Sequence, residues 1–509
     1  MLLPNSATLI EKLQTGIPGF DHISEGGLPK RRITLISGTA GTAKTVFACQ
    51  FLAEGILQHR QNGVFVTFEE SVEDIRRNML GFGWDIAAWE AEGRWAFVDA
   101  SRASAETVIA GEYDLDALIA RIQYAINKHQ AQRVSLDSLG AIFSQFEDSN
   151  ALRNELFRIA SALKKMDVTA IMTAERTEEY GAVARYGIEE FVADNVVILR
   201  NVLEEEKRRR TLEILKFRGT MHRKGEFPFT IIPGQGIVAI PLSALELKQR
   251  SSTLRISSGS AQLDEMCGGG FFRDSVILVS GATGTGKTLM ATTFLAGGAR
   301  QGERCLLFAF EESRDQLYRN AAGWGVDFEK LEADGLLRVM SVYPETAGLE
   351  DHLIEMQRMI AEFKPNRVAI DSLSALERVS TVKGFREFVI SLTSFIKHQE
   401  IAGLYTATTP TLLGGTSITE AHISTITDSI ILLRYVEVYG EMRRGLTVLK
   451  MRGSMHDKDI REFKIDMDGM HVGAAFRDVT GILSGNFMHV SASELERISH
   501  MFDDEDAEG

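Results

Sequence analysis

The chain has 509 residues, of which 44% are hydrophobic and 25% charged, an ordinary globular composition that excludes a fibrous or disordered protein. The 70 acidic and 56 basic residues give a formal net charge of -14, which argues against nucleic acid as the main ligand. Its 3 cysteines are widely spaced and form no disulfide framework or zinc cluster. No apolar run approaches about 18 residues, and the start lacks a signal peptide's basic and apolar regions, so we expect a cytoplasmic protein.

The chain contains an internal repeat, because four segments of the first half recur in the same order in the second half. The pairs are 33–45 with 276–288, 64–71 with 306–313, 133–139 with 367–373, and 212–224 with 446–458. A tandem duplication of one domain explains this register. We expect an N-terminal ATPase domain over 1–242, a C-terminal ATPase and kinase domain over 243–485, and a regulatory segment with an acidic tail over 486–509.

Within each copy, short apolar runs alternate with longer amphipathic stretches. In the first copy the predicted buried strands are 33–37, 64–68, 133–137, 169–173 and 195–199, and the predicted helices include 115–129 and 150–165. This alternation predicts an α/β fold with a mostly parallel central sheet and helices on both faces. The segments 212–218 and 446–452 are predicted to be later, antiparallel strands.

Each half carries a glycine-rich loop between a predicted strand and a predicted helix. Residues 281–288 read GATGTGKT, a complete P-loop, and residues 38–45 read GTAGTAKT. Backbone N–H groups and the helix N-terminus of such a loop bind phosphate, its lysine reaches the terminal phosphates, and its last hydroxyl can ligate Mg²⁺. The competing interpretation is a Gly/Thr-rich turn. The candidate ATP-binding residues are Gly41, Thr42, Ala43, Lys44 and Thr45 in the first loop and Gly284, Thr285, Gly286, Lys287 and Thr288 in the second.

The first loop has Ala43 where glycine is usual. If this position needs a positive φ, alanine costs on the order of 1 kcal/mol, although the backbone N–H is kept. We therefore expect a functional but altered first site, with a degenerate, structural loop as the alternative.

Acidic residues follow the strands behind each P-loop. Asp137 and Asp371 end apolar runs at the Walker-B position, where an acid holds Mg²⁺ directly or through water. The candidate metal contacts are these two aspartates with Thr45, Thr288 and Glu311. The pairs Glu69-Glu70 and Glu311-Glu312 are the catalytic candidates, because a carboxylate there can orient and deprotonate the attacking water or hydroxyl. The alternative is an ordinary solvated strand end.

A pair of cations recurs late in each half. Lys216 and Arg218, like Lys450 and Arg452, are two residues apart on a predicted strand and so share one face. They suit a phosphate and could act on a neighbouring subunit's nucleotide, whereas an isolated pair would be a solvated face. The interleaved and following candidates for the ATP site are Phe217, Thr220, His222 and Met451.

Together these features resemble the KaiC family, clock ATPases and autokinases first known from cyanobacteria. The double P-loop, the FEES segments and the LKxRGxxH strands carry the resemblance over roughly residues 10–500. It is most specific over 416–440, where the family's adjacent Ser and Thr autophosphorylation sites fall on Ser424 and Thr425. A strand-entry pair that caps local backbone is the alternative for these two residues.

The resemblance implies two tandem RecA-like P-loop NTPase domains in a hexameric double ring, with ATP and Mg²⁺ at subunit interfaces. It implies slow ATP hydrolysis by the first copy and phosphoryl transfer to Ser424 and Thr425 of the neighbour by the second, with Glu311 as the base. Lys450, Arg452 and Arg444 would come from the adjacent subunit. Trp324 corresponds to a residue that stacks on adenine, with a core tryptophan as the alternative.

The sequence departs from the cyanobacterial pattern at Ala43, over the shorter segment 481–497 and in the tail FDDEDAEG. The family's activator KaiA docks on that tail, so dependence on KaiA is doubtful here. A KaiB-type partner stays plausible, because residues 111–122 are family-like. The chain could therefore be a diverged member that acts as a simpler timer.

Two other classes compete with this interpretation. A RecA- or RadA-like DNA-dependent ATPase shares the fold, but the net charge and the lack of a separate basic module argue against it. A signalling scaffold would use nucleotide only to assemble a ring.

Overall fold

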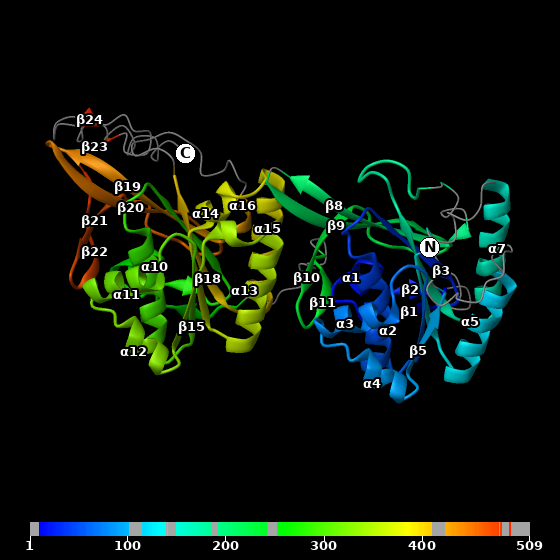
Figure 1. The fold of residues 1–509 in the computed structure, drawn as a ribbon. Helices are drawn as coiled ribbons and strands as arrows, with labels where there is room; N and C mark the ends of the chain where they lie inside the picture. The colour runs from blue at the N-terminus through cyan, green and yellow to red at the C-terminus, as the bar shows by residue number, and fades with distance from the viewer. Residues whose placement is uncertain are drawn as a thin grey trace, which may run out of the picture. The chain divides into compact units, whose positions relative to one another are not determined.

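The computed structural model describes residues 10–100, 115–138, 140, 149–185, 187, 192–204, 206–241, 252–409, 423–477, 479–480 and 488–489. The chain divides into two compact units, Met1–Ala244 and Leu245–Gly509 (Figure 1). Within the part of the chain just given, no helix has the length and apolar character needed to cross a membrane.

The first unit is built on one nine-stranded sheet of order β11-β10-β9-β8-β3-β7-β6-β4-β5, in which β8 to β5 are parallel and β9 to β11 antiparallel. The strands of this sheet are β3 (Ile33–Gly38), β4 (Gly63–Thr67), β5 (Trp95–Asp99), β6 (Arg133–Asp137), β7 (Thr169–Glu175), β8 (Asn195–Glu204), β9 (Lys207–Phe217), β10 (Glu226–Ile232) and β11 (Gly236–Ala239), while β1 (Lys12–Leu13) and β2 (Leu28–Pro29) pair with each other outside it. Its helices are α1 (Phe20–Ile23), α2 (Lys44–His59), α3 (Val72–Leu80), α4 (Ile86–Ala91), α5 (Leu115–His129) and α7 (Ser149–Lys165).

The second unit repeats this plan, with a nine-stranded sheet of order β16-β15-β17-β18-β14-β19-β20-β21-β22. Its strands are β12 (Arg255–Ile256), β13 (Phe271–Phe272), β14 (Val276–Gly281), β15 (Cys305–Ala309), β16 (Leu337–Ser341), β17 (Arg367–Asp371), β18 (Ala402–Thr408), β19 (Ser429–Val438), β20 (Glu441–Met451), β21 (Arg461–Asp466), β22 (Gly469–Ala475), β23 (Val479–Thr480) and β24 (Met488–His489). Its helices are α9 (Ala261–Met266), α10 (Lys287–Ala299), α11 (Arg314–Gly323), α12 (Phe328–Ala333), η3 (Pro344–Thr346), α13 (Leu349–Phe363), α14 (Leu373–Arg378), α15 (Val382–His398) and α16 (Ile423–Ile426).

The central parallel strands β3, β6, β14 and β17 are buried along their whole length because helices cover both faces of each sheet. Along β4, Val64 and Val66 join the core beneath α5 and α7, whereas Phe65 joins the core beneath α2. This alternation is the two-residue period of a strand with both faces buried. The predicted α/β fold is confirmed, and so are the antiparallel strands near 212–218 and 446–452, which are β9 and β20.

Candidate functional site

The two P-loops join a central strand to a long helix, β3 to α2 and β14 to α10. In each loop a threonine hydroxyl closes a turn: Thr42 Oγ1 donates to the Thr39 carbonyl at 2.8 Å, and Thr285 Oγ1 donates to the Ala282 carbonyl at 2.8 Å. The residue just before each helix has a left-handed backbone, with φ 70° at Ala43 and φ 107° at Gly286. Ala43 therefore does have a positive φ, which is the condition under which alanine is expected to be less favourable here than glycine.

The P-loop lysines fold back over their own loops. Lys44 Nζ donates to the carbonyls of Gly38 at 3.0 Å and Thr39 at 2.9 Å, and Lys287 Nζ donates to the Ala282 carbonyl at 3.0 Å. Burial lowers the pKa of both ammonium groups. A cation and a helix N-terminus that face one loop form a binding site for phosphate.

The Walker-B aspartates lie at the carboxyl ends of β6 and β17. Asp137 accepts hydrogen bonds from Thr173 and Thr45, and Asp371 accepts the same bonds from Thr406 and Thr288. Burial raises the pKa of both carboxyls, although the nearby P-loop lysine opposes this shift. A buried carboxylate beside a P-loop hydroxyl is an oxygen donor set that fits Mg²⁺.

The glutamate pairs are fixed between a strand and a helix cap. Ser71 Oγ caps α3, and Ser313 caps α11 with a reciprocal bond to Gln316, so both pairs stand just before a helix. The strand before each pair meets the Walker-B strand, because Phe68 N and Phe310 N donate to the carbonyls of the two aspartates at 2.9 and 2.8 Å. The structure therefore brings P-loop, aspartate and glutamates together at the carboxyl edge of each sheet.

The two members of each glutamate pair have different surroundings. Glu69 accepts a hydrogen bond from Ser138 Oγ at 3.0 Å, and Glu311 accepts one from Ser372 Oγ at 2.9 Å. Glu311 also forms an ion pair of 2.6 Å with Arg378, so both of its oxygens are engaged. The second members, Glu70 and Glu312, have a raised pKa, mainly through burial and then through the adjacent carboxylates.

The late cation pairs lie at the opposite edge of each sheet. Met451 pairs with Ser429, and Ser429 pairs with Ile277 near the start of β14, whereas the P-loop follows the end of that strand. In the first unit, Phe217 and Asn195 lie in the same way near the start of β3. The cations are thus about 13 Å, the length of four strand residues, from the P-loop edge of their own unit.

The residues between and after the cations have other surroundings. Phe217 and Met451 alternate with the cations, and their side chains are buried in the core. His222 packs edge-on against Phe217 with ring centroids 5.5 Å apart, and burial lowers its pKa. Thr220 is half-buried in the turn that follows β9.

The segment predicted to be phosphorylated lies on these cations. Lys450 Nζ donates to the carbonyls of Ser424 at 2.6 Å and Thr427 at 2.7 Å, and Arg452 donates to the carbonyl of Thr425 at 2.7 Å. Ser424 is half-buried and Thr425 is exposed on α16. In the first unit, Lys216 binds the Ala193 carbonyl at 3.0 Å in the corresponding way. Arg218 lies 3.9 Å from Asp194.

Arg444 does not lie with the other cations. Its Nε donates to the carbonyl of Gly284, in the P-loop of its own chain, at 3.3 Å. Arg444 lies opposite Tyr435, seven residues before Met451 on β20, and so lies well away from Lys450 and Arg452 along the strand. Trp324 directly follows α11 as its C-cap residue and is partly buried against the core of the second unit.

Several residues of the site belong to no recognised motif and were not predicted from the sequence. Ser138 and Ser372 follow the two aspartates directly, so their recurrence was a usable signal. Arg378 has no such signal, because the matching position in the first half is Ser144. Asn201 contacts Gly41 through its side-chain amide at 3.4 Å and is recognisable only from the fold.

Some predicted segments lie outside the described residues. These are 101–114, which includes the start of the family-like stretch 111–122, the stretch 410–422, residues 481–487 and the acidic tail. In the described residues, no group of three His, Cys, Asp or Glu side chains could hold a metal ion.

Fold and site together define a protein with two tandem nucleotide-binding P-loop ATPase domains. The family model described as "ATPase: KaiC" matches residues 13–244 and 256–476. The circadian clock protein KaiC3 of Synechocystis is 70% identical over 496 residues, covering 97% of this chain and 98% of the relative. The circadian clock oscillator protein KaiC of Thermostichus vulcanus is 56% identical, covering 99% and 97%. The chain belongs to the KaiC family, and this full-length likeness supports a KaiC-like ATPase and autokinase in circadian timing.

Proposed function

We propose that the protein assembles as a hexameric double ring in which the second unit of one chain phosphorylates Ser424 and Thr425 of its neighbour. The observation that carries this proposal is the placement of the target and the P-loop at opposite edges of one sheet. About 13 Å of strand separates these edges, so the target of a chain is out of reach of its own ATP. A neighbour in a ring would bring the two edges together.

The transfer chemistry follows from the residues at the carboxyl edge. The Ser424 or Thr425 oxygen attacks the γ-phosphorus, the bond from that phosphorus to the bridging oxygen breaks, and ADP leaves. The hydroxyl proton passes to Glu311, which Ser372 and Arg378 hold in place. Lys287 would bind the terminal phosphates, and Thr288 and Asp371 would hold Mg²⁺, which neutralises phosphate charge when bound.

The cation pairs would act on the neighbour's nucleotide. Lys450 and Arg452 donate to the carbonyls of Ser424 and Thr425 on α16, so the edge of the sheet that presents the target also presents cations for the γ-phosphate. Lys216 and Arg218 would serve the first ring, where Glu69 supports slow ATP hydrolysis. Arg444 would instead steady the P-loop of its own chain, and Trp324 would pack against adenine.

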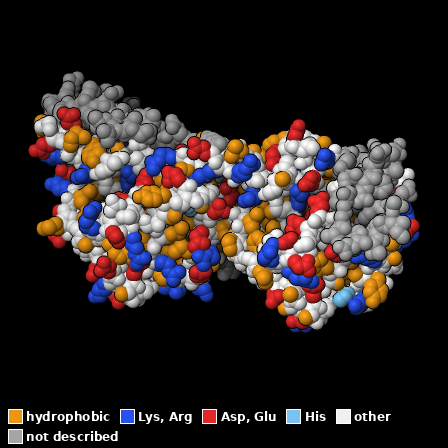
Figure 2. Space-filling view, in the orientation of Figure 1, with side chains coloured by type: hydrophobic (Ala, Val, Ile, Leu, Met, Phe, Trp, Pro, Cys, Tyr) orange, Lys and Arg blue, Asp and Glu red, His pale blue; other side chains and the backbone are white. Residues whose placement is uncertain are grey.

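The proposal extends to partners. A KaiB-like protein would bind the first unit, where the family-like stretch continues into α5, and dependence on KaiA is not proposed. DNA-dependent ATP hydrolysis is disfavoured by the net charge of -14. Figure 2 shows basic and acidic side chains intermixed over the described surface of the face drawn, rather than gathered as for a phosphate backbone.

The decisive test mixes two variants that are each inactive. Glu311→Gln keeps the target but lacks the base, and the double variant Ser424→Ala, Thr425→Ala keeps the base but lacks the target. With Mg-ATP, each variant alone should incorporate at least about 100-fold less phosphate than wild type. Mixed assemblies should carry phosphate on Ser424 and Thr425 of the Glu311→Gln chain.

Phosphopeptide mapping of the mixture reads out the transfer. The matched control is Glu69→Gln, which removes the corresponding carboxylate of the first unit and should leave phosphorylation in place. An unlabelled mixture that still hydrolyses ATP would refute transfer between chains.

A further inference from the structure

Each unit buries one arginine at the start of a central strand, at the edge of the sheet away from the P-loop. Arg133 begins β6 and Arg367 begins β17, and each residue is 0% exposed. Both guanidinium groups donate to corresponding backbone carbonyls, those of Phe51 and Phe294, at 2.7 and 2.9 Å. The two copies therefore share a buried positive charge in the same position.

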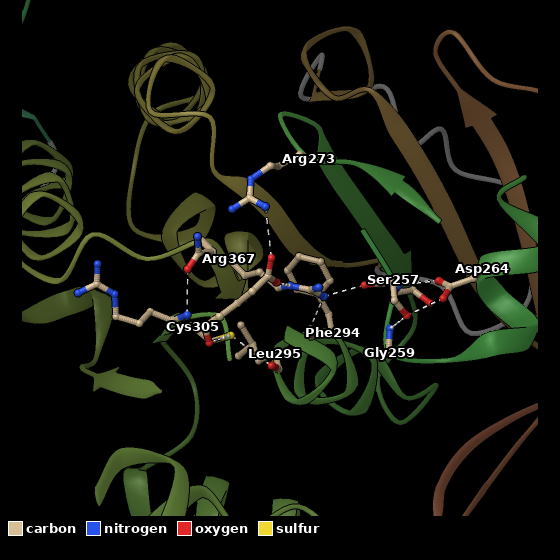
Figure 3. Close-up of polar contacts among 12 residues, drawn as sticks. Ser257, Gly259, Asp264, Arg273, Phe294, Leu295, Cys305 and Arg367 are labelled. Carbon is tan, nitrogen blue, oxygen red and sulfur yellow. Dashed lines mark hydrogen bonds and ion pairs between the residues drawn. The ribbon is translucent and has the colours of Figure 1, made fainter. Parts of the chain in front are cut away.

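The second unit neutralises this charge with a carboxylate. Arg367 Nε donates to Glu303 at 2.6 Å, and the other oxygen of Glu303 lies 3.4 Å from Arg273. Figure 3 shows Arg367 beside Phe294 and Ser257, whose backbone carbonyls accept hydrogen bonds from its guanidinium group. Buried charges of this kind are normally paired.

The first unit has a neutral partner instead. Arg133 Nε donates to the amide oxygen of Gln61 at 2.8 Å, and its remaining bonds go to backbone carbonyls, including that of Gln14 at 2.6 Å. In the described residues no carboxylate lies within 4.0 Å of it. Asp21 and Glu54 act on Arg133 from a longer distance, and Asp21 already accepts two bonds from Thr15.

A cavity of about 340 Å³ opens beside this arginine. Four of its lining residues are basic and none is acidic. The complete lining consists of Lys12, Leu13, Gln14, Gly26, Lys30, His59, Gln61 and Arg133. His59 Nε2 is buried with no hydrogen-bond partner among the described residues. Lys30 is paired with Glu11 at the rim, and Lys12 is bonded to backbone carbonyls.

We propose that this cavity binds a small phosphate-class anion, inorganic phosphate or the phosphate of a small phosphomonoester. Arg133, Lys30 and His59 supply the charge and the donor. The anion supplies the negative charge that Glu303 supplies in the second unit, whereas Gln61, the counterpart of Glu303 in the first unit, is neutral. The cavity is separate from the ATP site of its unit, because Arg133 begins β6 and Asp137 ends it, about 13 Å away. Its volume lies at the small end of the range of ligand pockets.

The test is binding of radiolabelled inorganic phosphate to the full chain, with the P-loops filled by Mg²⁺ and a non-hydrolysable ATP analogue. Equilibrium dialysis at constant ionic strength should give saturable binding to wild type. Gln61→Glu places the carboxylate of the second unit beside Arg133 and should weaken binding at least tenfold. His59→Asn leaves the Arg133 bonds intact and should weaken it several-fold.

The matched control is Gln132→Glu, which adds the same charge next to Arg133 but outside the cavity. This exposed side chain accepts a bond from Asn62 N at 3.0 Å, which glutamate can keep, so phosphate affinity should stay within about twofold of wild type. Competition by glycerol phosphate separates the sources: tighter binding than phosphate indicates a phosphomonoester, and weaker binding indicates phosphate itself. No saturable binding, or equal binding by wild type and Gln61→Glu, would overturn the proposal.

Discussion

Replacing Ala43 with glycine is expected to stabilise the first unit. Ala43 has φ 70° and ψ 32°, a left-handed conformation that costs a residue with a Cβ atom about 1–2 kcal/mol. Glycine loses about 0.4–1 kcal/mol of this advantage, because its unfolded chain has more freedom. The net gain for Ala43→Gly is therefore roughly 0.5–1 kcal/mol in the free energy of unfolding.

The reverse change in the second unit is the matched control. A Cβ atom at Gly286 would lie 2.9 Å from Phe463 Cε1 and 3.0 Å from Ile465 Cδ1, and φ there is 107°. Gly286→Ala therefore adds a clash to the backbone strain and should destabilise the second unit by about 2 kcal/mol or more.

Calorimetry of the nucleotide-free protein measures both changes. For a unit of this size, 1 kcal/mol moves the melting temperature by about 2–4 °C. The first unit should melt slightly higher in Ala43→Gly, and the second clearly lower in Gly286→Ala. A lower melting temperature for Ala43→Gly would refute the reasoning, because Ala43 would then not hold a left-handed backbone in the folded protein.

Two other substitutions test how the burial of a charged side chain decides its effect on the free energy of unfolding. Glu312→Gln should raise the free energy of unfolding near pH 8, because burial raises the pKa of this carboxyl and glutamine can still accept the bond from Asn320. Since the raised pKa makes the ionised form unfavourable in the fold, the advantage should fade as the pH drops through that pKa; an advantage independent of pH in urea unfolding would contradict this. Arg358→Ala should cost less than about 1 kcal/mol despite its two ion pairs, because they are exposed, and about 1 M salt should reduce even that; a larger loss in the same assay would show that the pairs act as a network.

Much of the fold could be predicted because local patterns and the tertiary structure agree. The strand predicted over 133–137 is β6, and the helix predicted over 115–129 is α5, since their apolar periods are unbroken. The repeat then added a check, because each motif had to recur at the same place.

The site was less accessible to this reasoning where it depends on contacts distant in sequence. The spacing of Lys450 and Arg452 indicated a shared face, but only the pairing of β20 with β19 places them at the edge away from the P-loop. The ion pair of Arg378 with Glu311 joins residues 67 positions apart, with no counterpart in the first half to reveal it. The buried arginines at the starts of β6 and β17 also look like surface charges in the sequence.

If phosphate passes only between chains, as proposed, the separation of P-loop and target across one sheet leaves an isolated chain with no phosphorylation target within its own reach. Under the proposed transfer, a chain that leaves the assembly can neither receive a phosphate on Ser424 or Thr425 nor pass one on. Its phosphorylation state then stays as it was in the ring that the chain left. Exchange of chains between rings would mix these phosphorylation states through the population. A diluted sample should therefore hold its phosphorylation pattern, while a concentrated one drifts toward a common state.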